Sequence, residues 1–212
     1  MDSPNAPYPA RLDIDYPEDG LNRLTTLFRV ILVIPILVVI GLLGGGAPGA
    51  QQIGEATWIT LSTSGFLVGP TVLMLLFRRK YPRWWFDWNL ELYRFSTRVG
   101  AYFLLMRDEY PSTDEEQAVQ LELDYPDAER DLNRWLPLVK WLLAIPHYIV
   151  LTIFAIVAMV LLVVAWFAIL FTGRYPRGLF RFMVDLHRWG LRVAAYMWLL
   201  TTDRYPPFSF EE

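Results

Sequence analysis

The fold is decided by the stretch WLLAIPHYIVLTIFAIVAMVLLVVAWFAILFTG, residues 141–173, which contains no charged residue in 33 positions. A second stretch, residues 30–77, holds a single charge, Glu55, in 48 positions. A helix needs only about 20 apolar residues to cross a hydrocarbon core of about 30 Å. Both stretches exceed this length, and the sequence therefore predicts an all-α integral membrane protein.

The composition of the whole chain agrees with this class. The 212 residues are 54% hydrophobic and only 19% charged, whereas about a quarter of a typical soluble domain is charged. The net charge of −3 excludes a nucleic-acid-binding protein, and the apolar content excludes disorder. With no Cys and two His, the chain is not expected to hold a disulfide scaffold, a reactive thiol, an iron–sulfur cluster or most zinc sites. The first 20 residues are polar and acidic, so no secretory signal is expected.

Several motifs occur twice, which predicts an internal duplication. Asp-Tyr-Pro at 15–17 recurs at 124–126, and RFSTRVGAYFLL at 94–105 matches RWGLRVAAYMWL at 188–199. Asn22 and Arg29 of the first copy align with Asn133 and Lys140 of the second. Tyr-Pro itself occurs seven times. The recurrences predict a first repeat over 1–113, a linker over 114–118 and a second repeat over 119–212.

Each repeat is predicted to contain a short β-strand, a membrane helix hairpin kinked by Pro35 or Pro146, and an amphipathic interfacial helix. Those of the first repeat are a strand at 11–16, membrane helices at 21–43 and 58–77, and an amphipathic helix at 84–106. Those of the second are a strand at 120–125, a membrane region at 132–172, and an amphipathic helix at 178–200. Because an isolated strand needs a partner, we expect the two strands to share one small sheet beneath the membrane, either within the chain or across an oligomer.

The basic residues predict the topology. All 19 Lys and Arg lie outside the loop 44–57, which is therefore expected to be external, with both termini cytoplasmic. A second, short hairpin within 132–172 would keep every basic residue in the cytoplasm, and this multi-pass arrangement is favoured. The alternative is a single long kinked helix, since no turn signal interrupts this region.

Both amphipathic helices carry a narrow charged stripe on a surface rich in Trp and other apolar residues. Such a helix is typical of the headgroup plane of a membrane, with its arginines open to water or phosphate. The alternative is a crossing helix whose stripe faces a pore. The predicted stripe residues are Glu91, Arg94, Arg98, Asp185, Arg188 and Arg192.

Two basic stretches, RRKYPR at 78–83 and GRYPR at 173–177, directly follow apolar segments. Basic clusters beside a membrane attract anionic lipid headgroups. The candidate headgroup contacts are Arg78, Arg79, Lys80, Arg83, Arg174 and Arg177.

Three segments of the second repeat resemble the bacterial membrane family catalogued as domain of unknown function 4389. They are LVKWLLAIPHYIVL at 138–151, WFAILFTGRYPRGLF at 166–180 and RVAAYMWLLTTDRYPPF at 192–208. The first repeat resembles a more divergent copy, in which Ile36 stands at the place of His147. The resemblance implies an integral membrane protein without an assigned activity, and it supplies no catalytic residue. The expected location is the bacterial inner membrane.

The motifs that accompany catalysis are missing from the sequence, which shows neither a Gly-rich phosphate loop nor a nucleophile elbow. His147 and His187 are expected to be structural, because haem ligation by His147 would need a second ligand. We therefore expect no catalytic residue, cofactor or metal, and a scaffold or accessory subunit with lipid contacts. Its expected partners are membrane lipids and other membrane subunits or a second copy, without nucleic acid. The alternatives are a channel or transporter lined by the charged stripes, and a lipid- or cofactor-handling enzyme subunit.

Overall fold

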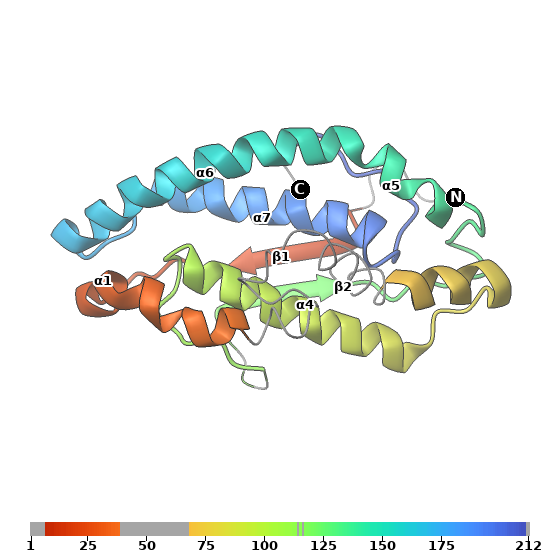
Figure 1. The fold of residues 1–212 in the computed structure, drawn as a ribbon, viewed down its shortest axis with the longest axis horizontal. Helices are drawn as coiled ribbons and strands as arrows, with labels where there is room; N and C mark the ends of the chain where they lie inside the picture. The colour runs from red at the N-terminus through yellow and green to blue at the C-terminus, as the bar shows by residue number, and fades with distance from the viewer. Residues whose placement is uncertain (1–6, 39–67, 114, 116, 211–212) are drawn as a thin grey trace, which may run out of the picture.

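The computed structural model describes residues 7–38, 68–113, 115 and 117–210 (Figure 1). The described part is mostly helical and contains one two-stranded sheet. The strands are β1 (Ala10–Ile14) and β2 (Val119–Leu123). The main helices are α1 (Arg23–Leu32), α4 (Arg83–Phe103), α5 (Lys140–Leu143), α6 (Ile145–Thr172) and α7 (Arg177–Met197). Shorter pieces are the apolar helix Val68–Arg78, whose last turn is π-helical from Met74, and a 3-10 turn at Leu136–Leu138.

The two strands pair with each other, as the sequence predicts. They run antiparallel, with Leu12 opposite Leu121 at the centre. Both strands alternate buried and exposed residues, so that one face of the sheet packs on the helices and the other faces outward. Apolar side chains on the inner face join the main hydrophobic core, which includes Met183 of α7 and Ala101 of α4.

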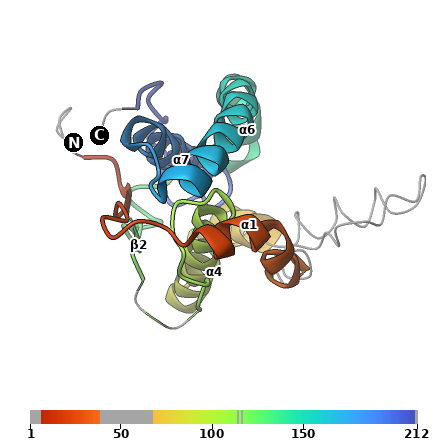
Figure 2. The ribbon, with the colours of Figure 1, turned by 90° about the vertical axis from the view of Figure 1, so that its left-hand side faces the viewer.

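The elements form three layers. The sheet is the first layer, with α7 packed along β1 and α4 along β2 as the second. Helix α6 covers α7 on the side away from the sheet, and α1 contacts α6. Figure 2 shows this order from the side, with the sheet at the left and α6 and α1 at the right.

Helices α6 and α7 form an antiparallel pair. The connection between them, Gly173–Pro176, is four residues long. Gly173 caps α6 in the left-handed conformation, with φ of 74°, which glycine adopts without strain. At the other end of the pair, the hydroxyl of Tyr148 near the start of α6 contacts the sulfur of Met197 at the end of α7. The two helices therefore run side by side along their length (Figure 1).

The predicted second hairpin is wrong, because α6 is one continuous helix from Ile145 to Thr172. After Pro146 in its first turn, this apolar run contains no Gly, Pro or polar pair, so no later backbone position favours a turn. Helical structure is interrupted two residues before each of the prolines expected to kink the helices, at Ala144 between α5 and α6 and at Val33, after which residues 34–38 are helical again. Most of the other predicted hairpin, between 39 and 67, lies outside the described residues.

Helix α6 is the one helix within the described ranges that is long and apolar enough to cross a membrane. Its most apolar 18-residue window has a mean hydropathy of 3.1, yet only 17% of that window is buried. At 1.5 Å per residue its 28 residues extend about 42 Å. The helix is apolar on all sides, which in a soluble protein requires burial on all sides.

Candidate functional site

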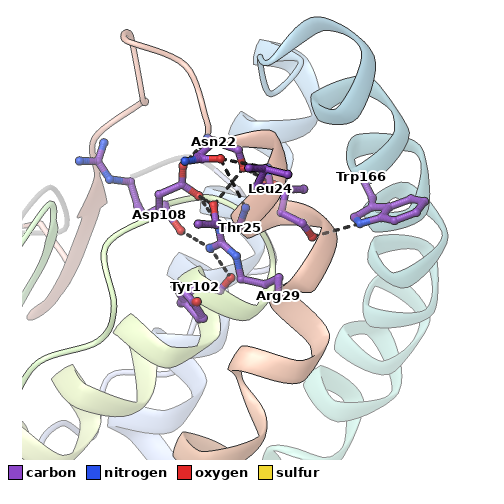
Figure 3. A network of polar contacts seen from close by, with 9 residues as sticks. Asn22, Leu24, Thr25, Arg29, Tyr102, Asp108 and Trp166 are labelled. Carbon is purple, nitrogen blue, oxygen red and sulfur yellow. Dashed lines mark hydrogen bonds and ion pairs between the residues drawn. The ribbon is translucent and has the colours of Figure 1, made fainter.

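A buried ion pair ties helix α1 to the segment that follows α4 (Figure 3). Arg29 on α1 is only 1% exposed and pairs with the carboxylate of Asp108. Its Nη1 also donates to the carbonyl of Tyr102 at 3.1 Å, and its guanidinium lies 4.1 Å from the centroid of the Tyr102 ring. The carboxylate and the carbonyl acceptors offset the cost of burying this charge, while the Nε of Arg29 is buried without a hydrogen-bond partner in the described part of the chain.

The same carboxylate fixes the beginning of α1. Asp108 accepts a hydrogen bond from the backbone N–H of Asn22 at 2.6 Å, and Asn22 caps the helix by accepting from the N–H of Leu24 at 2.9 Å. Trp166 of α6 donates its indole N–H to the carbonyl of Thr26 at 3.2 Å (Figure 3). The cluster therefore holds both α1 and its contact with α6.

A second cluster of the same kind lies at the start of α6. Lys140 on α5 is 1% exposed, and its Nζ lies 2.7 Å from a carboxylate oxygen of Asp203 and 2.7 Å from the carbonyl of Thr202. The Nζ also lies 4.9 Å from the ring centroid of Tyr196. Burial lowers the pKa of Lys140, and the charge of Asp203 opposes part of that effect.

Asp203 also accepts from the N–H of Asn133, whose side chain accepts from the N–H of Trp135 at 2.9 Å. Asn133 and Lys140 thus make the contacts that Asn22 and Arg29 make in the other cluster. The sequence pattern aligned these four positions but did not identify Asp108 and Asp203. The available signal was their position, two residues before the Tyr-Pro that ends each half.

The stripe arginines bind the strands, each from the other half of the chain. Arg188 on α7 donates Nε–H to the carbonyl of Leu12 at 2.8 Å, and Arg94 on α4 donates Nε–H to the carbonyl of Leu121 at 2.9 Å. Each of these two arginines also has an acidic partner in its own helix. Glu91 lies 2.6 Å from Arg94, and Asp185 lies 3.5 Å from Arg188.

The expectation that all four stripe arginines are open to water or phosphate is wrong for Arg192, which is 3% exposed. Arg192 donates to the carbonyl of Ser209 at 3.1 Å, and Arg98 donates to the carbonyl of Ser112 at 2.8 Å. Helical periodicity identifies a charged face, but it does not reveal which backbone segment covers that face.

Tyr-Pro units of the two halves also contact each other. Tyr16 donates its hydroxyl to the carbonyl of Tyr175, and Tyr125 donates to the carbonyl of Tyr81. Arg177 lies over the ring of Tyr16 with 5.2 Å to the centroid, as Arg83 lies over Tyr125 at 4.8 Å. The six candidate headgroup residues are all exposed, namely Arg78, Arg79, Lys80, Arg83, Arg174 and Arg177.

Both histidines have structural contacts. His147 in α6 is buried, accepts from the indole N–H of Trp189 at 3.2 Å, and stacks on Phe208 with 3.9 Å between ring centroids. His187 in α7 contacts the carbonyl of Met183 at 2.8 Å, and burial lowers its pKa. Within the described ranges, no group of three or more His, Asp or Glu side chains could hold a metal ion.

A polar groove of about 590 Å³ opens beside β2. Two arginines of the α4 stripe line it, together with carboxylates and amides from the neighbouring loop and strand. The lining includes Arg94, Arg98, Glu109, Gln117 and Gln120. The groove therefore presents charged and amide side chains, two of which, Arg94 and Arg98, already donate to the carbonyls of Leu121 and Ser112.

Comparison with known proteins supports the resemblance seen in the motifs. Residues 135–209 match the model of the family described as "Domain of unknown function (DUF4389)". The match is a single copy that includes α5, α6 and α7, and the first 134 residues lie outside it. No curated protein and no solved structure matches the chain.

Proposed function

We propose that this chain is a non-catalytic membrane protein that serves as a scaffold or accessory subunit of a larger membrane assembly. The observation that carries the proposal is the exposed surface of α6, a helix with a mean hydropathy of 3.1 and little burial. Soluble monomers rarely expose apolar patches of more than a few hundred Å². A lipid environment accounts for this surface because acyl chains replace water around it.

The membrane part is proposed to include the first-half segments 21–43 and 58–77, crossing as a hairpin in the bacterial inner membrane. The basic residues around these segments support a multi-pass chain with both termini in the cytoplasm. Single cysteines at residues 2 and 212 test this topology, because the sequence contains no native Cys. Labelling of the two positions from opposite sides would contradict it.

The chain is further proposed to be an internal duplication whose halves exchange contacts around one sheet. The support comes from recurring pairs at aligned positions. Arg29 with Asp108 corresponds to Lys140 with Asp203, and Arg94 with Leu121 corresponds to Arg188 with Leu12. Contacts of this kind would hold the apolar parts of the two halves in a fixed relative position, as a scaffold requires.

Lipid and protein contacts are assigned to different surfaces. The six exposed basic residues named above are proposed to bind anionic headgroups, each contributing about 1 kcal/mol near a charged membrane surface. The polar groove beside β2 is proposed to face a protein partner in the aqueous phase. We favour a scaffold over a channel because Arg94 and Arg188 are engaged by strand carbonyls and by their own acidic neighbours.

The test is purification of the tagged full chain from native membranes. We expect it to stay in the membrane pellet after alkaline carbonate extraction and to co-purify with larger membrane subunits. Val160→Asp, on the exposed side of α6, should weaken membrane retention, while Asp87→Asn on the surface of α4 serves as the control. Ion flux through the purified protein alone in liposomes would instead support the channel alternative.

A further inference from the structure

The membrane location proposed above leaves open how α6 lies in the bilayer. We propose that α6 lies within one leaflet, along the membrane plane. Its exposed apolar face then contacts the acyl chains of that leaflet. Both ends of α6 then emerge on the same side of the membrane. The inference rests on the proposed membrane function and concerns the orientation of the second half alone.

The first step is that α7 must share the orientation of α6. The two helices are antiparallel neighbours, joined by the short connection Gly173–Pro176 and in contact again through Tyr148 and Met197. In between, Phe154 of α6 packs against Trp189 of α7 with 5.9 Å between ring centroids. If α6 crossed the bilayer, α7 would lie at the same depth beside it.

The second step is that α7 carries the charged sheet. Arg188, near the middle of α7, binds the carbonyl of Leu12 and the carboxylate of Asp13 in β1. The outward face of the sheet holds Arg11, Asp13 and Glu122, and more than half of each of these side chains is exposed. A crossing α6 would place this charged face at the depth of the hydrocarbon, where ionised side chains are strongly disfavoured.

The third step is the order of the layers. The sheet and α6 lie on opposite sides of α7, which contacts both of them (Figure 2). When α6 lies flat among the acyl chains, α7 reaches the headgroup level and the sheet lies in water. The exposed apolar side chains of α6 extend along its whole length, from Ile149 near the start to Phe171 near the end.

The fourth step is the distribution of charge along the chain. Arg134 and Lys140 precede α6, and Arg174, Arg177 and Arg181 follow it. Basic residues flanking membrane segments tend to remain on the cytoplasmic side. An in-plane α6 satisfies this preference for both groups, whereas a single crossing would place the groups on opposite sides.

Single cysteines in the otherwise Cys-free full chain test the two ends of α6. Glu129→Cys and Arg174→Cys, both on exposed residues, are labelled with a membrane-impermeant maleimide in right-side-out and inside-out vesicles. We expect both to react from the same side, together with Asp13→Cys on the sheet. Reaction of Glu129→Cys and Arg174→Cys from opposite sides would overturn the proposal.

A spin-label series tests the depth of the helix. Ile149→Cys, Ile156→Cys and Val163→Cys are exposed positions seven residues apart, so they share one face of α6. Power saturation with oxygen and a nickel chelate is expected to give the same depth for all three labels. A crossing helix would instead change depth by about 10 Å per seven residues.

The outcomes separate this inference from the proposed function. A protein that carbonate releases from the membrane, and whose α6 labels are reached by the water-soluble nickel chelate, contradicts the membrane function itself. A protein that remains in the membrane but shows a depth gradient along α6 contradicts only the in-plane orientation. Equal depths with same-side labelling support both.

Discussion

Leu12 and Leu121 lie opposite each other at the centre of the sheet, and the carbonyl of each accepts a hydrogen bond from an arginine in the other half of the chain. The sheet is thereby held from both edges, by Arg188 on one side and Arg94 on the other. Two strands alone are marginally stable in water. The helices and these two arginines therefore supply much of what keeps the strands together.

Arg188→Ala tests this role. The substitution removes the hydrogen bond to Leu12 and the ion pair with Asp13, so we expect the free energy of unfolding to fall by about 1–3 kcal/mol. The measurement is chemical denaturation in detergent, followed by tryptophan fluorescence. Arg181→Ala on the exposed side of the same helix is the control and should change stability by less than about 0.5 kcal/mol. Equal effects of the two substitutions would contradict the assignment.

Two tyrosines at aligned positions should respond differently to removal of the hydroxyl. Tyr81 donates to the carbonyl of Leu199 at 2.8 Å, so Tyr81→Phe should cost about 1–2 kcal/mol. The hydroxyl of Tyr175 is buried and has no hydrogen-bond partner within the described part of the chain, so Tyr175→Phe should be neutral or stabilising. Thermal unfolding of the two variants in parallel measures the difference, and the opposite ranking would contradict the contacts.

The same phenols predict an alkaline limit of stability. Burial raises the pKa of Tyr8, Tyr81 and Tyr175 above the ordinary value of about 10. Their folded-state pKa values are raised, so the stability they contribute is present below about pH 10 and is lost as the pH rises further. Denaturation between pH 9 and 12 should show this decline, with a smaller slope in Tyr175→Phe. A slope that Tyr175→Phe leaves unchanged would argue against burial of that phenol.

Removing one partner of the buried pair Lys140 and Asp203 should lower the free energy of unfolding much more than replacing both partners with uncharged residues. Asp203→Ala leaves the ammonium group of Lys140 buried without its carboxylate, and we expect a loss of about 3–5 kcal/mol. Adding Lys140→Met should restore much of this loss. The exposed pair of Arg83 and Asp87 is the control, since Asp87→Ala should cost at most about 1 kcal/mol. A double variant no more stable than Asp203→Ala would show that the charge is not the cause.

Replacement of Gly20 is predicted to destabilise the fold. Its φ is +83°, and a Cβ at this position would lie 2.8 Å from the carbonyl oxygen of Gly173, which also accepts from the N–H of Leu21. Gly20→Ala therefore combines backbone strain with a clash against main chain, and should cost about 2 kcal/mol or more. Gly190→Ala on α7 has open space and should stabilise the helix by up to about 1 kcal/mol. Circular dichroism melts of the two variants provide the comparison.

The strands and the amphipathic helices could be predicted from the sequence because each shows a regular pattern within its own segment. The alternation of residues 11–16 and 120–125 predicted strands that the structure places at Ala10–Ile14 and Val119–Leu123. The charged stripes predicted helices within a few residues of α4 and α7. In both cases the signal is the period of side-chain burial, which a short segment carries by itself.

The predictions that failed concern features that depend on more than one short segment of the sequence. The hairpin expected within 132–172 relied on where charges would lie across a membrane, whereas the uninterrupted apolar run permits the continuous helix α6. The contact of Arg188 with Leu12 joins residues 176 positions apart, and the two strands pair residues that are more than 100 positions apart. The aspartates that complete the buried ion pairs lie in segments without helical or strand periodicity, so their role emerged only from the three-dimensional arrangement.

The exchange of contacts between the halves has a consequence for biosynthesis. Arg188, which binds Leu12, leaves the ribosome 176 residues later, and β2, which pairs with β1 in the described part of the chain, is also made well after β1. At a synthesis rate of about 5–20 residues per second, the first half waits for roughly 9–35 seconds without its packing surface. A chain interrupted anywhere before α7 would leave β1 uncovered. Premature termination should therefore expose the nascent protein to proteolysis from its N-terminal end, even though the missing sequence lies at the other end.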